Sequence, residues 1–227
     1  MVEDFKWEYV FNIELVIDSL PFILEGAGFT LLISALGMVF GLFLGLIISL
    51  FRMSKNFVTR SAARVYISFM RGTPLLAILF ILFFGLPLVG IELAAITAAV
   101  IGISIHFAAY IAEVIRSAIS SVPKGQWEAA ETLRMSYAQV MWRIILPQAT
   151  RIALPPLAST FMDIIKGTSL AMVITVPEMF YRAKVISGQT YESLTMYILI
   201  ALIYWGICSV ITVFQDYLEK KFNKYLV

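Results

Sequence analysis

Residues that commonly build metal sites and disulfides are almost missing from this sequence. Its 227 residues include one cysteine, Cys208, and one histidine, His106. A single cysteine excludes an intrachain disulfide framework, and together with a single histidine it excludes a Cys/His zinc site. Ser104 lies two positions before His106, so on a helix the two side chains diverge and cannot form a nucleophile–base pair. We therefore predict no catalytic residue and no metal site.

Charged residues are also scarce, at 14% of the chain against about 25% in soluble domains. The net charge of +2 provides no electrostatic basis for binding nucleic acid. The sequence has no Gly-Lys dipeptide and therefore no phosphate-binding P-loop. We predict that the chain binds no nucleic acid, holds no cofactor and is not itself an enzyme, so that any energy source lies in another protein.

Apolar residues, in contrast, make up 60% of the chain, and the mean hydropathy is +0.89. A soluble fold of this length has too little interior to hide so much apolar surface, whereas a lipid bilayer removes that limit. Because a membrane-spanning helix needs about 20 apolar residues, we predict an all-α integral membrane bundle of five transmembrane helices. The predicted spans are residues 26–51, 65–87, 93–115, 152–176 and 193–215.

Lys and Arg are distributed unevenly among the segments that connect these spans. Twelve of the 17 fall in the first connection, the third connection and the C-terminal tail. Because cytoplasmic loops carry the excess of basic residues, we predict that the N-terminus is outside and the C-terminus cytoplasmic. Residues 9–24 place apolar side chains on one helical face, which predicts an interfacial helix. The predicted parts are an extracytoplasmic or interfacial segment at 1–25, a transmembrane domain at 26–217 with a long loop at 120–150, and a cytoplasmic tail at 218–227.

The first predicted span carries glycine at every fourth position, at Gly37, Gly41 and Gly45. Small residues at this spacing let two helices approach closely in lipid. Packing within one chain is the simpler interpretation of the pattern, and a contact between two copies is the alternative.

The third connection, residues 116–151, has the most distinctive pattern in the sequence. The stretch from Trp127 to Leu133 predicts a short helix too polar to span a bilayer, and these two residues are candidate anchors in a partner's pocket. Ser136 is a candidate cap for a second helix, which is expected to stop at Pro147. A helix, a break and a second helix lying across the membrane surface predict a docking element.

This connection also resembles the cytoplasmic loop of permease subunits of bacterial ABC importers. The resemblance follows the spacing E-A-A-x3-G-x9-I-x-L-P, which the sequence reproduces except at the glycine. Segments 71–75, 108–113 and 154–157 are similar to the polar amino acid branch, which includes histidine, glutamine and cystine permeases. Segments 16–22 and 202–205 look most like L-cystine permeases.

The resemblance implies an ATP-driven importer of a polar amino acid, with L-cystine expected and a glutamine, histidine or arginine type as the alternative. It implies a multi-pass protein of the bacterial plasma (inner) membrane that forms a dimer with a second permease subunit, expected to be identical. Separate ABC ATPase subunits would bind ATP and magnesium, and an extracytoplasmic solute-binding protein would deliver the amino acid. The residues implied to couple the ATPase to the membrane domain are Glu128, Ala129, Ala130, Arg134, Ile144, Leu146 and Pro147.

Arg134 stands where the family usually has glycine. Glycine suits a left-handed turn after a helix, and that conformation costs another residue roughly 1–2 kcal/mol. We expect either a reshaped turn or a tolerated strain at Arg134, with its guanidinium a candidate contact to the ATPase.

Polar side chains inside the predicted spans are candidates for the solute pathway, because such groups are expensive in a bilayer. Asp163 and Lys166 are three residues apart and can pair on one helical face, either as a structural ion pair or as part of a cavity lining. His106 is either a buried hydrogen-bonded residue or a pathway residue, and Glu113 is expected to pair with Arg116. The pathway candidates are Arg71, Thr73, His106, Tyr110, Thr160, Asp163, Lys166, Thr168 and Ser169.

The nature of the solute and two rival functions depend on these positions. In arginine-type relatives a glutamate takes the place of Thr160, so the threonine favours a neutral solute. One rival is a stand-alone secondary transporter driven by protonation of Asp163 or His106, which the lack of inverted repeats disfavours. The other is a membrane scaffold that recruits an ATPase without transporting.

Overall fold

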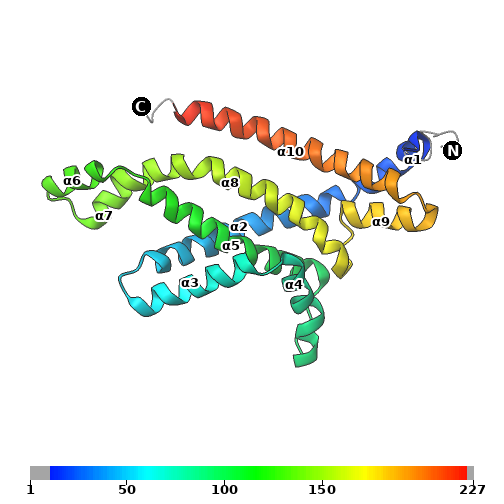
Figure 1. Ribbon diagram of the computed structural model, residues 1–227, viewed down its shortest axis with the longest axis horizontal. Helices are drawn as coiled ribbons and strands as arrows, with labels where there is room; N and C mark the ends of the chain where they lie inside the picture. The colour runs from blue at the N-terminus through cyan, green and yellow to red at the C-terminus, as the bar shows by residue number, and fades with distance from the viewer. Residues whose placement is uncertain (1–10, 224–227) are drawn as a thin grey trace, which may run out of the picture. The chain divides into compact units, whose positions relative to one another are not determined.

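The computed structural model describes residues 11–223, and every regular element in that range is a helix (Figure 1). The N-terminal half contains α1 (Ile13–Leu24), α2 (Ala27–Met53), α3 (Phe57–Gly72), α4 (Leu75–Phe80), the turns η2 (Ile81–Gly85) and η3 (Leu86–Val89), and α5 (Ala95–Ser120). The C-terminal half contains α6 (Lys124–Thr132), α7 (Tyr137–Val140), the π-helical turn η4 (Met141–Ile145), α8 (Leu146–Thr168), the 3-10 turn η5 (Ser169–Ile174), α9 (Met179–Thr190) and α10 (Ser193–Asn223).

The predicted all-α membrane fold is confirmed. Four helical segments among the described residues are long and apolar enough to cross a bilayer, and the number is five if the bent pair formed by α3 and residues 75–89 is counted as one span. α1 confirms a helix within residues 9–24. Residues 1–10 of the predicted N-terminal segment and 224–227 of the predicted tail lie outside the described residues. The orientation of the termini stays a prediction.

The second predicted span differs from the structure in where it begins and in having a break inside it. α3 begins at Phe57 rather than at residue 65, because the Asn56 side chain accepts a hydrogen bond from the amide of Val58 at 2.8 Å and caps the helix. The helix then breaks at Thr73, whose φ of −105° and ψ of 134° are extended. Pro74 causes this break, since the proline ring disfavours a helical conformation in the preceding residue.

The prediction that the helix after Ser136 stops at Pro147 is wrong, because helical structure continues from Tyr137 to Ile174. The π-helical turn η4 precedes α8 and bonds the amide of Leu146 to the carbonyl of Met141. Pro147 therefore falls in the first turn of α8, where a missing N–H is tolerated. The fourth span accordingly has no boundary at residue 152.

Two compact units make up the chain. The first comprises residues up to 36, 75–103 and 164–210, and the second comprises 37–74, 104–163 and the residues from 211 onward. Each long helix that crosses a unit boundary contributes its two halves to different units.

In the first unit, α1 and α9 lie side by side with the start of α10 (Figure 1). Ile23, Met179 and Met196 are fully buried among these helices. Arg182 of α9 donates to the carboxylate of Glu25 at 2.6 Å, which adds an ion pair at the end of α1. The first unit is therefore held by a small apolar core with an ion pair beside it.

In the second unit, α2 packs closely against α5. A Cβ atom at Gly45 would lie 2.7 Å from Cγ2 of Ile111 and 3.1 Å from the carbonyl oxygen of Ala108. A Cβ atom at Gly41 would lie 3.2 Å from the Ile111 side chain. Two of the three predicted small residues therefore serve helix packing within the chain, as the simpler interpretation expected.

We predict that Gly45→Ala destabilises the protein by about 1–3 kcal/mol, because the added methyl group overpacks the contact with α5. The matched control is Gly28→Ala in the same helix, where no atom lies within 4 Å of the new Cβ and alanine favours the helix. Thermal denaturation of the detergent-purified protein measures both. An unchanged melting temperature for Gly45→Ala would contradict the close packing.

Candidate functional site

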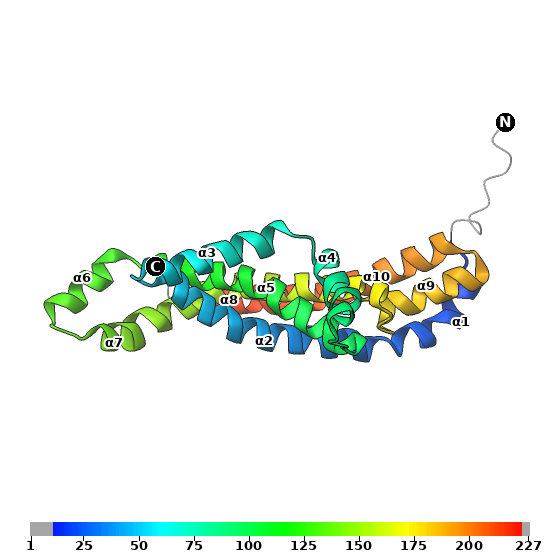
Figure 2. The same cartoon turned by 90° about the horizontal axis from the view of Figure 1, so that it is seen from below.

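The predicted docking element is a helical elbow formed by α6, α7 and η4 (Figure 2). Ser136 caps α7 as predicted: its hydroxyl accepts from the amide of Gln139, whose side chain accepts from the amide of Ser136. This reciprocal pair is a capping box, which satisfies two amides that the helix leaves free. The chain reversal between α6 and α7 is thus determined by local hydrogen bonds.

Arg134 occupies the left-handed position at the end of α6, with φ of 53°. The amide of Met135 donates to Ala130 and the amide of Arg134 donates to Glu131, which is the bonding pattern of a Schellman motif. The turn is therefore the one that glycine would make, and the arginine tolerates the strain. Of the two expected outcomes at this position, the structure supports the second.

The elbow has an apolar core of its own, shared with α5 and α8. Ala130 and Ile145 are fully buried in it, and Ile144 and Leu146 pack against it. Trp127 also packs against this core, which differs from the expectation that it anchors in a partner. Predicted support residues 144 and 146 therefore hold the elbow to the membrane helices.

The opposite side of the elbow is exposed. Glu128 and Ala129 face solvent on α6. Leu133 is 74% exposed and Tyr137 is 68% exposed. Small and apolar side chains on a short exposed helix can fit a groove of another protein. The adjacent Ala130 cannot take part in such a contact, because it is buried in the core of the elbow.

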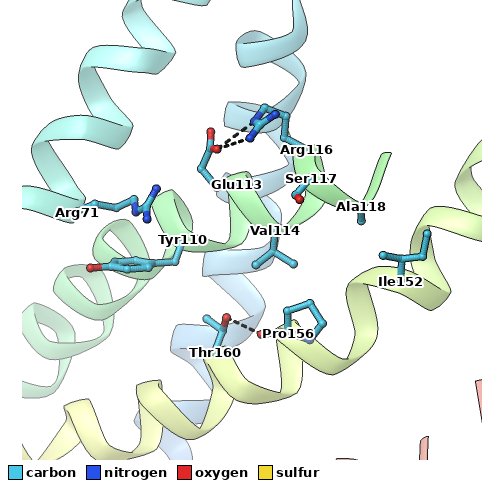
Figure 3. A pocket seen from close by; sticks show the side chains of 10 residues that line it. All are labelled: Arg71, Tyr110, Glu113, Val114, Arg116, Ser117, Ala118, Ile152, Pro156 and Thr160. Carbon is cyan, nitrogen blue, oxygen red and sulfur yellow. Dashed lines mark hydrogen bonds and ion pairs between the residues drawn. The ribbon is translucent and has the colours of Figure 1, made fainter. Parts of the chain in front are cut away.

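Three pathway candidates, Arg71, Tyr110 and Thr160, line one cavity of about 430 Å³ in the second unit (Figure 3). The guanidinium carbon of Arg71 lies 5.4 Å from the centre of the Tyr110 ring, within cation–π range. The hydroxyl of Thr160 donates to the carbonyl of Pro156 at 2.8 Å. The cavity also has an acidic wall, which Glu113 supplies.

The predicted pair of Glu113 and Arg116 is confirmed, with an oxygen–nitrogen distance of 2.8 Å (Figure 3). Arg52 at the end of α2 adds a second guanidinium, 3.7 Å from the same carboxylate. The sequence did not predict this contact, because residues 52 and 113 meet only through the packing of α2 on α5. The carboxylate is thereby neutralised by two cations of the protein itself.

The remaining pathway candidates lie elsewhere. His106 is buried beside the rings of Phe107 and Tyr110, at 5.2 and 5.4 Å, and its Nδ1 has no hydrogen-bond partner among residues 11–223. In the first unit, Lys166 and Ser169 line a cavity of about 200 Å³.

The three pathway candidates that remain are Thr73, Asp163 and Thr168. Thr73 lies in the break between α3 and α4. Asp163 and Lys166 keep their three-residue spacing on α8. Thr168 is buried, with its hydroxyl 3.5 Å from that of Tyr204.

Glu178 is a buried polar residue that the sequence analysis missed. Its carboxylate accepts hydrogen bonds from the amides of Phe180 at 2.8 Å and Tyr181 at 2.7 Å, and from the hydroxyl of Tyr204 at 3.0 Å. It caps α9 between two apolar segments and is fully buried. Burial raises the pKa of Glu178 to about 7, although the three hydrogen bonds oppose that rise. Glutamate is not a favoured N-cap residue, so the sequence around Glu178 did not predict that it caps a helix. The preceding Pro177 is the one local sign of a helix start.

Among residues 11–223, no group of three His, Cys, Asp or Glu side chains is placed to hold a metal ion. The described residues form membrane-type helices with a polar cavity and an exposed helical elbow, an arrangement that fits the membrane subunit of a transporter.

Comparisons with known proteins specify the kind of transporter. Residues 37–224 match the family described as binding-protein-dependent transport system inner membrane component, and the chain belongs to this family. It is 58% identical to the probable amino-acid ABC transporter permease protein YckA of Bacillus subtilis (strain 168), over 100% of both chains. It is 42% identical to the L-cystine transport system permease protein TcyB of the same organism, over 91% of this chain and 88% of that protein.

A solved structure agrees with these relatives. The crystal structure of an amino acid ABC transporter with histidines matches with a TM-score of 0.86 at 34% identity, over 90% of this chain and 96% of that one. The chain is therefore an amino-acid ABC transporter permease subunit, an integral membrane protein whose ATPase is a separate protein. The family resemblance in the sequence is confirmed.

The buried carboxyl group predicts a pH dependence of stability. Because the pKa of Glu178 is higher in the folded protein than the ordinary value of 4.5, folding favours the protonated form, and stability falls as pH rises from about 4.5 to about 7. Glu178→Gln removes this contribution, on the order of 3 kcal/mol over that window. Thermal denaturation of both proteins across pH 4–8 measures the difference, and parallel pH profiles would contradict a buried, protonated Glu178.

Proposed function

We propose that this permease imports L-cystine across the inner membrane of a bacterium, as half of a homodimer driven by separate ATPase subunits. The names of relatives support the substrate class: TcyB and TcyL are L-cystine permeases, and GlnM is a probable glutamine permease. A glutamine, histidine or arginine type of solute is the alternative. ATP and magnesium bind the ATPase, and an extracytoplasmic binding protein delivers the solute.

The single observation that carries the proposal is the cavity around Arg71. This guanidinium makes no hydrogen bond or ion pair with another described residue; it lies over the Tyr110 ring and interacts with Glu113 only through longer-range electrostatics. A guanidinium that lines a cavity in this way suits a carboxylate, which it can bind through two parallel hydrogen bonds. The hydroxyl of Thr160 already donates a hydrogen bond to the carbonyl of Pro156, so toward a solute its oxygen can only accept, which suits an ammonium group. Together they complement the zwitterionic part of an amino acid.

The same cavity argues against a basic solute side chain. Glu113 is the one carboxylate among its ten lining residues, and Arg116 and Arg52 both engage it. A lysine or arginine solute would therefore find no free negative charge there. The side-chain amide of glutamine and the disulfide of cystine are uncharged and need none. Asp163 lies outside this lining, so it does not change the balance.

The elbow is the proposed contact with the ATPase. Glu128, Ala129 and Leu133 form its exposed side, while Ala130, Ile144 and Leu146 join it to α5 and α8. A push on the exposed side would therefore pass into helices that also line the cavity. Arg134 and Pro147 complete the coupling set, the first at the turn and the second at the start of α8.

These features also separate the proposal from its rivals. A secondary transporter would need neither an exposed elbow nor an ATPase, and a scaffold would need no polar cavity. The exposed elbow and the cavity are both present in the second unit.

We expect Ala129→Trp to abolish ATP-driven uptake in reconstituted vesicles while the protein still folds, because the new ring blocks the exposed side of α6. Ala129→Ser is the matched control and should transport normally. Ala130→Trp should instead lower the melting temperature, because Ala130 is fully buried. Full-speed uptake by Ala129→Trp would refute the proposed docking side.

The substrate assignment is tested by ATP hydrolysis of the reconstituted complex. Cystine-loaded binding protein should stimulate it, and lysine or arginine should not. Arg71→Gln should raise the apparent KM for cystine about 10- to 100-fold, the value of a charge-assisted hydrogen bond, and Arg71→Lys should recover part of the loss. Arg64→Gln, an exposed change on the same helix outside the cavity lining, is the control. Stimulation by arginine alone would overturn the choice of a neutral solute.

A further inference from the structure

A second cavity of the same unit has no role in the proposed transport cycle. It measures about 500 Å³, within the range of roughly 300–1,000 Å³ that small-molecule sites occupy. It lies among the end of α2, the end of α5 and the α7–η4 part of the elbow. Its lining residues are Leu50, Met53, Ser54, Lys55, Ile119, Tyr137 and Met141.

The lining changes character along α2. Leu50, Met53 and Met141 give an apolar wall, while Ser54 and Lys55 follow at the point where the helix ends. Residues 26–51 carry no charge, and the first basic residue, Arg52, opens the polar stretch. Since an uncharged run of this length spans the hydrocarbon core, the cavity has its apolar part at the edge of that core and its basic part at headgroup level.

The charge and the exposed apolar side chains beside the cavity also indicate a position at the membrane surface. Between Glu25 and Glu92 the sequence has no acidic residue, and Arg52, which pairs with Glu113 of α5, is the basic side chain of the first connection for which the described residues show an ion pair. Directly after Lys55, Phe57 and Val58 are 70% and 71% exposed. Exposed apolar side chains among basic ones are typical of segments that lie at a membrane surface.

We propose that this cavity binds one anionic phospholipid, with an acyl chain against the apolar wall and the phosphate at Lys55 and Ser54. Basic pockets between transmembrane helices on the cytoplasmic side suit anionic headgroups. An acidic side chain of the ATPase would satisfy Lys55 but leave the apolar wall empty. The lipid accounts for both halves of the lining.

The position of Tyr137 links the lipid site to the elbow. This residue begins α7, directly after the Ser136 cap, and lines the cavity together with the end of α2. A bound lipid would therefore touch the membrane helix and the elbow at once and stabilise the elbow in place. This consequence rests on the proposed coupling function, whereas lipid binding itself does not.

Native mass spectrometry of the full-length purified protein tests the binding. Phosphatidylglycerol and phosphatidylcholine with identical acyl chains are added separately, and retained lipid is counted. Wild-type protein should retain phosphatidylglycerol preferentially, and Lys55→Gln should weaken that retention about fivefold, as expected for one basic side chain near an anionic headgroup. Lys184→Gln removes the same charge from an exposed position on α9 and should leave retention unchanged.

A second variant distinguishes lipid bound inside the cavity from lipid attracted only by the positive charge of the protein surface. Met53→Trp keeps every charge but fills the cavity, and it should also lose phosphatidylglycerol, with size-exclusion chromatography reporting that it folds. Equal retention of both lipids, equal losses in Lys55→Gln and Lys184→Gln, or full retention by Met53→Trp would each overturn the proposal. A loss of ATPase co-purification in Lys55→Gln with lipid retention unchanged would identify a protein as the occupant and overturn it as well.

Discussion

The contact of α2 with α5 is the interaction on which the second unit depends. Gly45 and Gly41 bring the backbone of α2 against Ile111 and Ala108, so that a Cβ atom would overlap Ile111 at Gly45 and crowd it at Gly41. In lipid no hydrophobic force drives helices together, so close packing of this kind must do it. α5 in turn supplies Tyr110, which lines the Arg71 cavity. A looser contact here would displace the cavity wall and the support of the elbow together.

The same contact determines how the unit tolerates charge. Glu113 on α5 meets Arg116 one turn away and Arg52 across the interface, so a carboxylate near the membrane boundary is neutralised by the protein itself. Hydroxyl groups inside α8 are likewise satisfied locally, as Thr160 bonds the carbonyl of Pro156. Because polar groups in a bilayer are costly when unpaired, Arg71 is distinctive. It lies over an aromatic ring and forms no ion pair with a described acidic residue, since the nearby Glu113 is engaged by Arg116 and Arg52, which is why it carries the argument about the solute.

The elbow shows how far local sequence signals reach. Ser136 and Gln139 specify a capping box at fixed spacing, and the turn at Arg134 forms with a left-handed residue even though glycine is absent. Both were predictable because their hydrogen bonds join residues within six positions of one another. Trp127 was predicted to face a partner and instead packs inward, because the side of α6 that is buried depends on α5 and α8. Pro147 was misleading for a similar reason: the π-helical turn before it places it where a proline is harmless.

The sequence by itself determined that this chain is a helical membrane protein that resembles the permease subunits of ABC importers, because apolar run length and motif spacing are local properties. The tertiary structure alone decided that Arg71, Tyr110 and Thr160 share a cavity, that Arg52 reaches Glu113, and that Glu178 is buried beneath Tyr204. These residues are separated along the sequence by 26 to 89 positions, and no periodicity along a single helix relates them. Only the packing of one helix on another brings such side chains within bonding distance.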